Sequence, residues 1–192
     1  AFEGSPEIKA NSKDIYVFGN FAFVTCHGGF FVVRLDALPE RMEIVDEVVA
    51  RLPGDPRPKT VASVVANPAG THIFVATDGP VPKAIYSCPF DAETGTVGEP
   101  LSILSGPDLP GSTAHVRYHA AADRFYIACR GGNLMEIDAS DPANLKHLST
   151  WNNGGYFGEM QDCIVYDFGS GPRVLAVKNN EGFAILDPDD GL

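Results

Sequence analysis

The chain has 192 residues, of which 44% are hydrophobic and 20% are charged, and it carries a formal net charge of −11 with a sequence pI near 4.7. We expect no nucleic-acid partner, because binding to phosphate backbones depends on Lys and Arg side chains that displace counterions. No apolar run reaches the roughly eighteen residues that span a bilayer, so we also expect no membrane insertion.

The 20 Gly and 15 Pro are typical of a protein with many turns and few long helices. The first residue is not Met, and the N-terminus lacks a basic region followed by an apolar run. We therefore expect a processed product or a piece of a longer chain. The compartment stays open, and a periplasmic or secreted location is favoured over the alternatives.

One local pattern recurs along the sequence at intervals of about fifty residues, a period typical of propeller arrays. It is a short alternating apolar run that ends in a small or polar residue and a turn, as in a half-buried strand and its hairpin. The copies lie at 21–27, 72–78, 124–130 and 173–178. The repeats predict that residues 1–192 form a single all-β module, a β-propeller with about four blades visible.

The first predicted blade covers 14–52, with strands at 14–18, 21–26, 30–35 and 42–49. Its last strand is ambiguous, because Met42, Val45, Val48 and Val49 are also spaced like one face of a helix. The β-branched residues favour a strand. The second blade covers 59–105, with strands at 60–65, 71–77, 84–88 and 100–104.

The third predicted blade covers 113–151, with strands at 114–118, 124–129, 134–137 and 147–151. The fourth covers 160–187, with strands at 162–166, 173–177 and 182–186, and it lacks an outer strand. Residues 5–10 could fill that place and close the ring. The Gly pairs at 28–29 and 131–132 are read as hairpin turns, since no Lys-Ser/Thr or helix follows as in a phosphate loop.

These residues resemble known propeller families. The segment 60–79 resembles the repeat of lactonase-type and YVTN-type propellers, and Asp91–Gly95 is similar to the same group. Residues 30–37 and 134–144, each after a Gly-Gly turn, look more like LVIVD-repeat propellers. Because members of these families usually have seven blades, two alternatives stay open: a small closed propeller, or part of a seven-bladed one, which we favour.

Propeller ligands usually sit over the central channel, on the face made by the loops between blades and between the second and third strands of a blade. We predict His27, His115 and Arg130 as candidate catalytic residues there. Candidate ligand-binding residues with polar, charged or aromatic side chains are Asp78, Lys178, Asp162, Trp151 and Asn153. Arg130 and Lys178 could bind a carboxylate, and a histidine or Asp78 could act as a base.

We predict no cofactor and no metal site. His115 and His119 are four apart on a segment that reads as a strand, which separates them by about 13 Å. The favoured function is a binding or scaffolding module with a polar site at the channel mouth, and an enzyme is the less favoured reading. The alternative is a lactonase-like or lyase-like enzyme that acts on a sugar acid or lactone.

The expected partners are a small molecule or a protein. Self-association is expected if the ring is incomplete, because exposed strand edges attract further strands. The sequence contains Cys26, Cys88, Cys129 and Cys163, with no CxxC pair. Three of them fall within apolar strands, so we favour inert core thiols, with a disulfide or redox chemistry as alternatives.

Overall fold

The structure is a computed structural model of the chain, and it describes residues 11–36, 38–79, 83–106, 109, 113–152, 160–167, 172–178 and 182–187. For Asp167 and Lys178 it describes the backbone alone. The secondary structure of these residues consists of β-strands and one 3₁₀ turn, η1 (Ala120–Ala122). None of the described residues belongs to a helix long and apolar enough to cross a bilayer.

The strands form four antiparallel sheets, each built from strands that are consecutive in the sequence. Sheet 1 contains β1 (Ile15–Phe18), β2 (Phe21–Cys26), β3 (Gly29–Arg34) and β4 (Glu43–Val49). Sheet 2 contains β5 (Thr60–Ala66), β6 (His72–Asp78), β7 (Ala84–Pro89) and β8 (Ser102–Ser105). Sheet 3 contains β9 (Thr113–His119), β10 (Arg124–Cys129), β11 (Asn133–Asp138) and β12 (Lys146–Asn152). Sheet 4 contains β13 (Met160–Asp167), β14 (Pro172–Lys178) and β15 (Gly182–Leu186).

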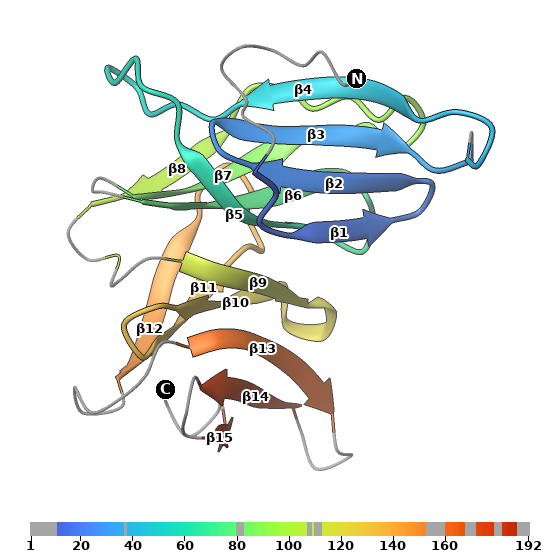
Figure 1. Cartoon of the computed structure of the whole chain (residues 1–192). Helices are drawn as coiled ribbons and strands as arrows, with labels where there is room; N and C mark the ends of the chain where they lie inside the picture. Colours follow the sequence, from blue (N-terminus) through green and yellow to red (C-terminus); the bar gives the residue numbers. More distant parts are fainter. Residues whose placement is uncertain are drawn as a thin grey trace.

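The sheets follow one another down the picture in Figure 1, from sheet 1 at the top to sheet 4 at the bottom. The first strand of each sheet is the innermost one, since β1 contacts β5, β5 contacts β9, and β9 contacts β13. The later strands of each sheet lie progressively farther out. This radial order of meandering sheets is the order of strands in a β-propeller, which confirms the predicted fold class.

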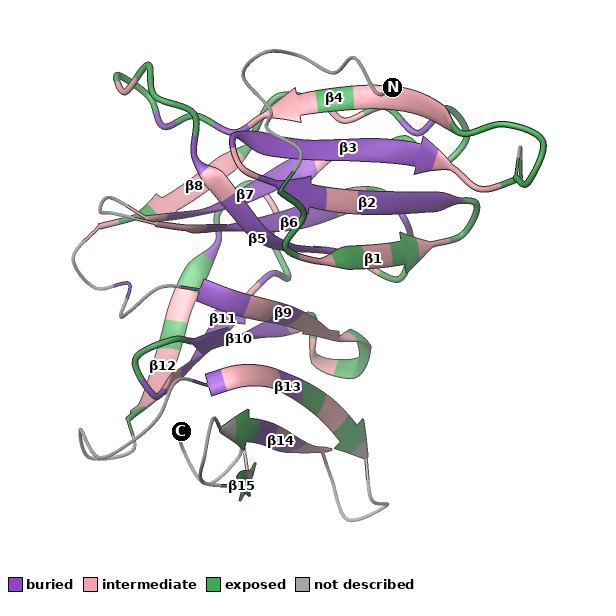
Figure 2. Cartoon of the chain, viewed as in Figure 1, coloured by how far each residue is buried: buried purple, intermediate pink, exposed green. Residues whose placement is uncertain are grey.

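Apolar layers between neighbouring sheets hold the arc together, and many residues of the strands beside them are coloured as buried in Figure 2. Sheets 1 and 2 share a core that includes Phe23, Phe30 and Val75. Sheets 2 and 3 meet through Phe74 and Phe125, whose rings stack with centroids 4.9 Å apart. Because each strand alternates its side chains between two faces, the central sheets can pack on both neighbours.

The outward face of sheet 4 is apolar and exposed. Phe183 is 66% exposed and Ile185 is 58% exposed, and both lie on the outermost described strand of this sheet. At the other end of the arc, Ile15 of sheet 1 is 62% exposed. Over the described residues the arc is therefore open, and these residues do not form the small closed ring that was one alternative. The predicted closing strand at 5–10 lies outside the described residues.

The ambiguous segment after β3 is a strand, as we favoured. Its helix-like spacing comes from a β-bulge, since Val32 pairs with Asp46 and Val33 pairs with Ile44. The extra residue, Val45, shifts the alternation of side chains by one position. Val45 and Val48 therefore face sheet 2, whereas Ile44 and Val49 face the other way.

Candidate functional site

The inner strands begin at one end of the sheets, and a β-bulge interrupts the pairing of three of them near that end. The bulges skip Ala62 in β5, Ala114 in β9 and Gln161 in β13. The residues directly after the bulges are Ser63, His115 and Asp162. They occupy equivalent rows of successive sheets, because their partners Ala76, Ala128 and Val177 are equivalent positions of the repeat.

Asp14 is the corresponding residue of sheet 1, just before β1. Its backbone pairs with Thr25, the repeat equivalent of Ala76. The Thr25 hydroxyl accepts a hydrogen bond from the Asp14 amide at 2.8 Å and also lies 3.2 Å from the carbonyl oxygen of Ala62 in the next sheet. Thr25 is fully buried, so it fixes Asp14 against sheet 2.

The Asp14 carboxylate joins three sheets. Its Oδ2 atom accepts a hydrogen bond of 2.7 Å from the Ser63 hydroxyl and lies 3.3 Å from Nδ1 of His115. The Ser63 hydroxyl in turn accepts a hydrogen bond from the amide of Val116. We call Asp14, Ser63 and His115 the inner cluster. It links sheets 1, 2 and 3 through side chains that differ in chemistry from sheet to sheet.

Burial and hydrogen bonding act in opposite directions on Asp14. Burial favours the neutral acid, but the nearby His115 ring and the hydrogen bond from Ser63 outweigh it, so the pKa of Asp14 lies below its ordinary value. The His115 side chain is 28% exposed while its Nδ1 atom is buried. The exposed part of the ring therefore lies away from Asp14, which orients the imidazole from behind.

Sheets 3 and 4 are joined by an ion pair in the same region. Nη2 of Arg117, two residues after His115, lies 2.7 Å from Oδ2 of Asp162. Both side chains are about one-third exposed, at 29% and 37%. The other carboxylate oxygen of Asp162 accepts a hydrogen bond from the amide of Cys163. A cation and a carboxylate thus extend the inner cluster toward sheet 4.

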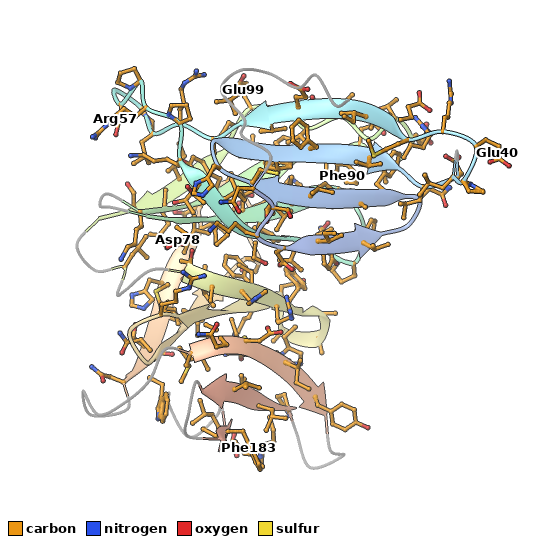
Figure 3. All side chains as sticks on the ribbon, in the orientation of Figure 1. Glu40, Arg57, Asp78, Phe90, Glu99 and Phe183 are labelled. Atoms are coloured by element: carbon orange, nitrogen blue, oxygen red, sulfur yellow. The ribbon has the colours of Figure 1, made fainter. Side chains whose placement is uncertain are left out.

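A second tier of polar residues lies where the second strand of each sheet ends, two residues beyond the row of the inner cluster, or about 7 Å along the strand. Nδ1 of His27 lies 2.7 Å from the hydroxyl of Thr60. Asp78, which pairs with Thr60 across β5 and β6, has its Oδ2 atom 3.6 Å from Nη1 of Arg130. Figure 3 labels Asp78 at this end of the sheets.

The structure places the sequence-predicted residues in different surroundings. His115 and Asp162 lie on inner strands, and His27, Asp78 and Arg130 lie in the second tier. The backbone of Lys178 pairs with Met160 at the equivalent end of sheet 4. Trp151 lies on β12, the outermost strand of sheet 3, where it packs at the core between sheets 3 and 4. Asn153 lies outside the described residues.

Trp151 is three strands away from His115 across sheet 3, or about 14 Å by strand spacing. The structure therefore does not bring it together with the inner cluster. Among the described residues no group of three His, Cys, Asp or Glu side chains is arranged to hold a metal ion. His119 lies at the far end of β9 from His115, paired with Arg124.

Three residues of the site, Asp14, Ser63 and Arg117, were missed by the sequence analysis. Alignment of the repeats holds a signal for two of them, because Asp14 and Ser63 fall at the row of His115 and Asp162. A polar residue at one row of every inner strand indicates a shared environment. Arg117 has no such signal, since its contact with Asp162 depends on how sheets 3 and 4 pack.

The fold and its polar inner strands define a protein of the β-propeller type. The LVIVD repeat model matches residues 10–34 and 123–152, which contain β1 to β3 of sheet 1 and β10 to β12 of sheet 3. This confirms the resemblance predicted for the first and third repeats. The matched segments do not include 60–79, so the likeness of that stretch to YVTN-type repeats stays a prediction. No curated protein matches the chain significantly.

Solved structures with a similar fold include proteins named as lactonases. A protein assigned as a 6-phosphogluconolactonase from Bacteroides uniformis aligns with a TM-score of 0.67 at 15% identity, over 93% of this chain and 54% of its own. A similarly assigned protein from Bacteroides fragilis gives a TM-score of 0.64 at 15% identity, over 93% of this chain and 54% of its own. The periplasmic gluconolactonase of Pseudomonas aeruginosa gives 0.65 at 18% identity, over 91% of this chain and 52% of its own. The chain thus spans about half the length of these structures, and at such identities the likeness is one of fold.

Proposed function

We propose that this propeller is a lactonase-like hydrolase that opens the ring of a sugar lactone, with His115 as the general base. The observation that carries the proposal is the contact of 3.3 Å between His115 Nδ1 and the Asp14 carboxylate, in a ring that is partly exposed. A carboxylate behind a histidine fixes its tautomer and orientation and favours acceptance of a proton on the other nitrogen.

In the proposed step, His115 accepts a proton from a water molecule as the water oxygen bonds to the lactone carbonyl carbon. The bond between that carbon and the ring oxygen then breaks, and the departing alkoxide takes the proton back from the imidazolium. The product is a hydroxy acid. Arg130, whose side chain is 41% exposed, supplies a cation for the new carboxylate or for a phosphate on the sugar.

The names of the structural neighbours support this substrate class, since they are assigned as 6-phosphogluconolactonases and a gluconolactonase. One of them is described as periplasmic. That description supports the proposal of a periplasmic or secreted location for this chain. The likeness to these neighbours is one of fold. The substrate of this chain is therefore set by its own residues in the inner cluster and the second tier.

A second candidate is a module that binds a sugar acid without turning it over. It is favoured by Ser63, which is fully buried and donates a hydrogen bond to Asp14, so the inner cluster offers no exposed hydroxyl nucleophile. Arg117 and Arg130 are both in contact with carboxylates, as in a site built to exchange those partners for an anionic ligand.

The test is hydrolysis of glucono-1,5-lactone and 6-phosphogluconolactone, measured as the rate of acid release above the spontaneous rate. We expect His115→Gln to lower kcat/KM by about a hundredfold or more, in the range typical of a lost general base. Asp14→Asn should lower it less, because the base is disoriented but present. His147→Gln is the matched control, since His147 lies on β12 with its own hydrogen bonds to residues 149 and 150.

Absence of catalysed ring opening by the wild-type protein, or equal rates in wild type and His115→Gln, contradicts the enzyme. Isothermal titration with gluconate then separates the remaining readings. Binding that is lost in Arg130→Ala supports the sugar-acid module, whereas no heat on titration with gluconate leaves the scaffolding role predicted from the sequence.

A further inference from the structure

A separate cavity lies between the outer halves of sheets 1 and 2, away from the inner strands. Its volume is about 560 Å³, within the range of small-molecule sites. Its lining is mixed: apolar side chains come from both sheets, with Phe30 and Val48 on one side and Val75 and Ile103 on the other, and polar atoms lie between and around them. A smaller hollow of about 420 Å³ shares Leu52 and Ile103 with it, so the space is elongated along β8.

Tyr86 of β7 lines this cavity and is 3% exposed. Its hydroxyl is buried and has no hydrogen-bond partner. Leaving a buried polar group without a partner is costly, so such a group next to a cavity indicates a place for a complementary atom. Burial raises the pKa of Tyr86 to about 12, so the hydroxyl stays protonated and can donate a hydrogen bond.

Acidic side chains surround the mouth of the cavity. Asp46, Glu47 and Glu99 line it, together with one cation, Arg51. Asp46 also accepts a hydrogen bond of 2.8 Å from the amide of Val97, which holds the loop after β7 against β4. Figure 3 labels Glu99 beside this end of β4. The net negative charge of the rim disfavours anionic ligands.

We propose that this cavity is a second ligand site, which binds a neutral molecule with an apolar part and one hydrogen-bond acceptor that meets the Tyr86 hydroxyl. The walls supply the apolar contact, the hydroxyl supplies orientation, and the acidic rim selects against anions. Asp14 and His115 do not line it. The site is therefore independent of the lactonase proposal, and either can fail without the other.

The test uses Nile red, a neutral apolar dye with a carbonyl acceptor, and measures its fluorescence on titration with the protein. Tyr86→Phe keeps the ring and removes the donor, so we expect the Kd to rise about threefold to tenfold, as for one lost hydrogen bond. Tyr118→Phe is the matched control, because Tyr118 lies in sheet 3, away from the cavity, and its hydroxyl donates a hydrogen bond to Asp123; the Kd of this variant should not change.

A second variant keeps the proposal testable if Tyr86→Phe fails to fold. Ile103→Phe places a larger side chain in both hollows and should abolish saturable binding. Ile185→Lys, on the exposed face of sheet 4, should leave binding unchanged. If Ile185→Lys loses binding while Tyr86→Phe and Ile103→Phe bind as the wild type does, the dye binds on sheet 4 and the proposal is overturned. Equally tight binding of the anionic dye anilinonaphthalene sulfonate in competition with Nile red would also overturn it.

Discussion

At the scale of single residues, Asp14 shows how one side chain joins sheets that are far apart in sequence. Its carboxylate receives the Ser63 hydroxyl and faces His115, and its pKa is lowered as a result. A carboxyl whose folded pKa is depressed stabilises the fold above its unfolded pKa, and this stability is lost as the pH falls through the folded value.

We expect Asp14→Asn to lower the free energy of unfolding at pH 7 by about 1–3 kcal/mol, the cost of losing charge-assisted hydrogen bonds at a partly buried site. The difference from wild type should shrink as the pH falls below the ordinary pKa of an Asp and through the lower pKa of Asp14 in the folded protein, because Asp14 then becomes protonated in both states. Urea denaturation at a series of pH values measures it. Asp36→Asn, at an exposed carboxylate, is the control, and a pH-independent difference for Asp14→Asn would contradict the prediction.

The cysteines provide a second prediction at this scale. Cys26, Cys88, Cys129 and Cys163 are all unpaired and buried. Burial raises the pKa of each thiol, to about 12 for the last three, which suppresses the reactive thiolate. We expect Ellman's reagent to detect essentially no thiol in the native protein at pH 8 and all of them in denaturant. Rapid native reaction of even one would show that its sheet opens readily.

At the scale of elements, the close approach of β3 and β4 depends on Gly29. A Cβ atom at this position would overlap the backbone carbonyl of Val48, which cannot move without shifting β4. We expect Gly29→Ala to destabilise the fold by about 1–3 kcal/mol, as for other backbone clashes, and to weaken Nile red binding because β4 walls the cavity.

Gly19→Asn is the control for this change. Gly19 has a φ of +54° and open space around its Cα, and Asn tolerates that conformation. Thermal unfolding should place the control within about 0.5 kcal/mol of wild type. A wild-type Tm for Gly29→Ala would mean that β3 and β4 separate at little cost.

At the scale of the whole molecule, the open arc leaves sheet 4 with an apolar face that nothing in the described part of the chain covers. Ile164, Tyr166, Phe183 and Ile185 on this face are all at least 48% exposed. Large apolar patches of this kind are typical of interaction surfaces. We propose that a second copy of the chain covers this face in solution.

The double variant Phe183→Lys/Ile185→Lys should therefore shift the protein from a concentration-dependent oligomer to a monomer in sedimentation velocity. Leu101→Lys/Met42→Lys replaces two exposed apolar residues elsewhere, at 48% and 59% exposure, and should leave the oligomer intact. A wild-type monomer at every concentration, or equal behaviour of both double variants, contradicts the proposal.

The sequence by itself determined the architecture, because the alternation of apolar residues and the turn residues between them are local properties that recur in every repeat. It also identified His115 and Asp162 as candidate site residues. It could not foresee the bulge at Val45, since one extra residue makes a strand look like a helix face, or the partners of His115. Only the tertiary structure decided that Asp14, Ser63 and His115 meet and that Trp151 lies apart from them. Contacts between sheets depend on how the sheets pack, and no local pattern carries that information.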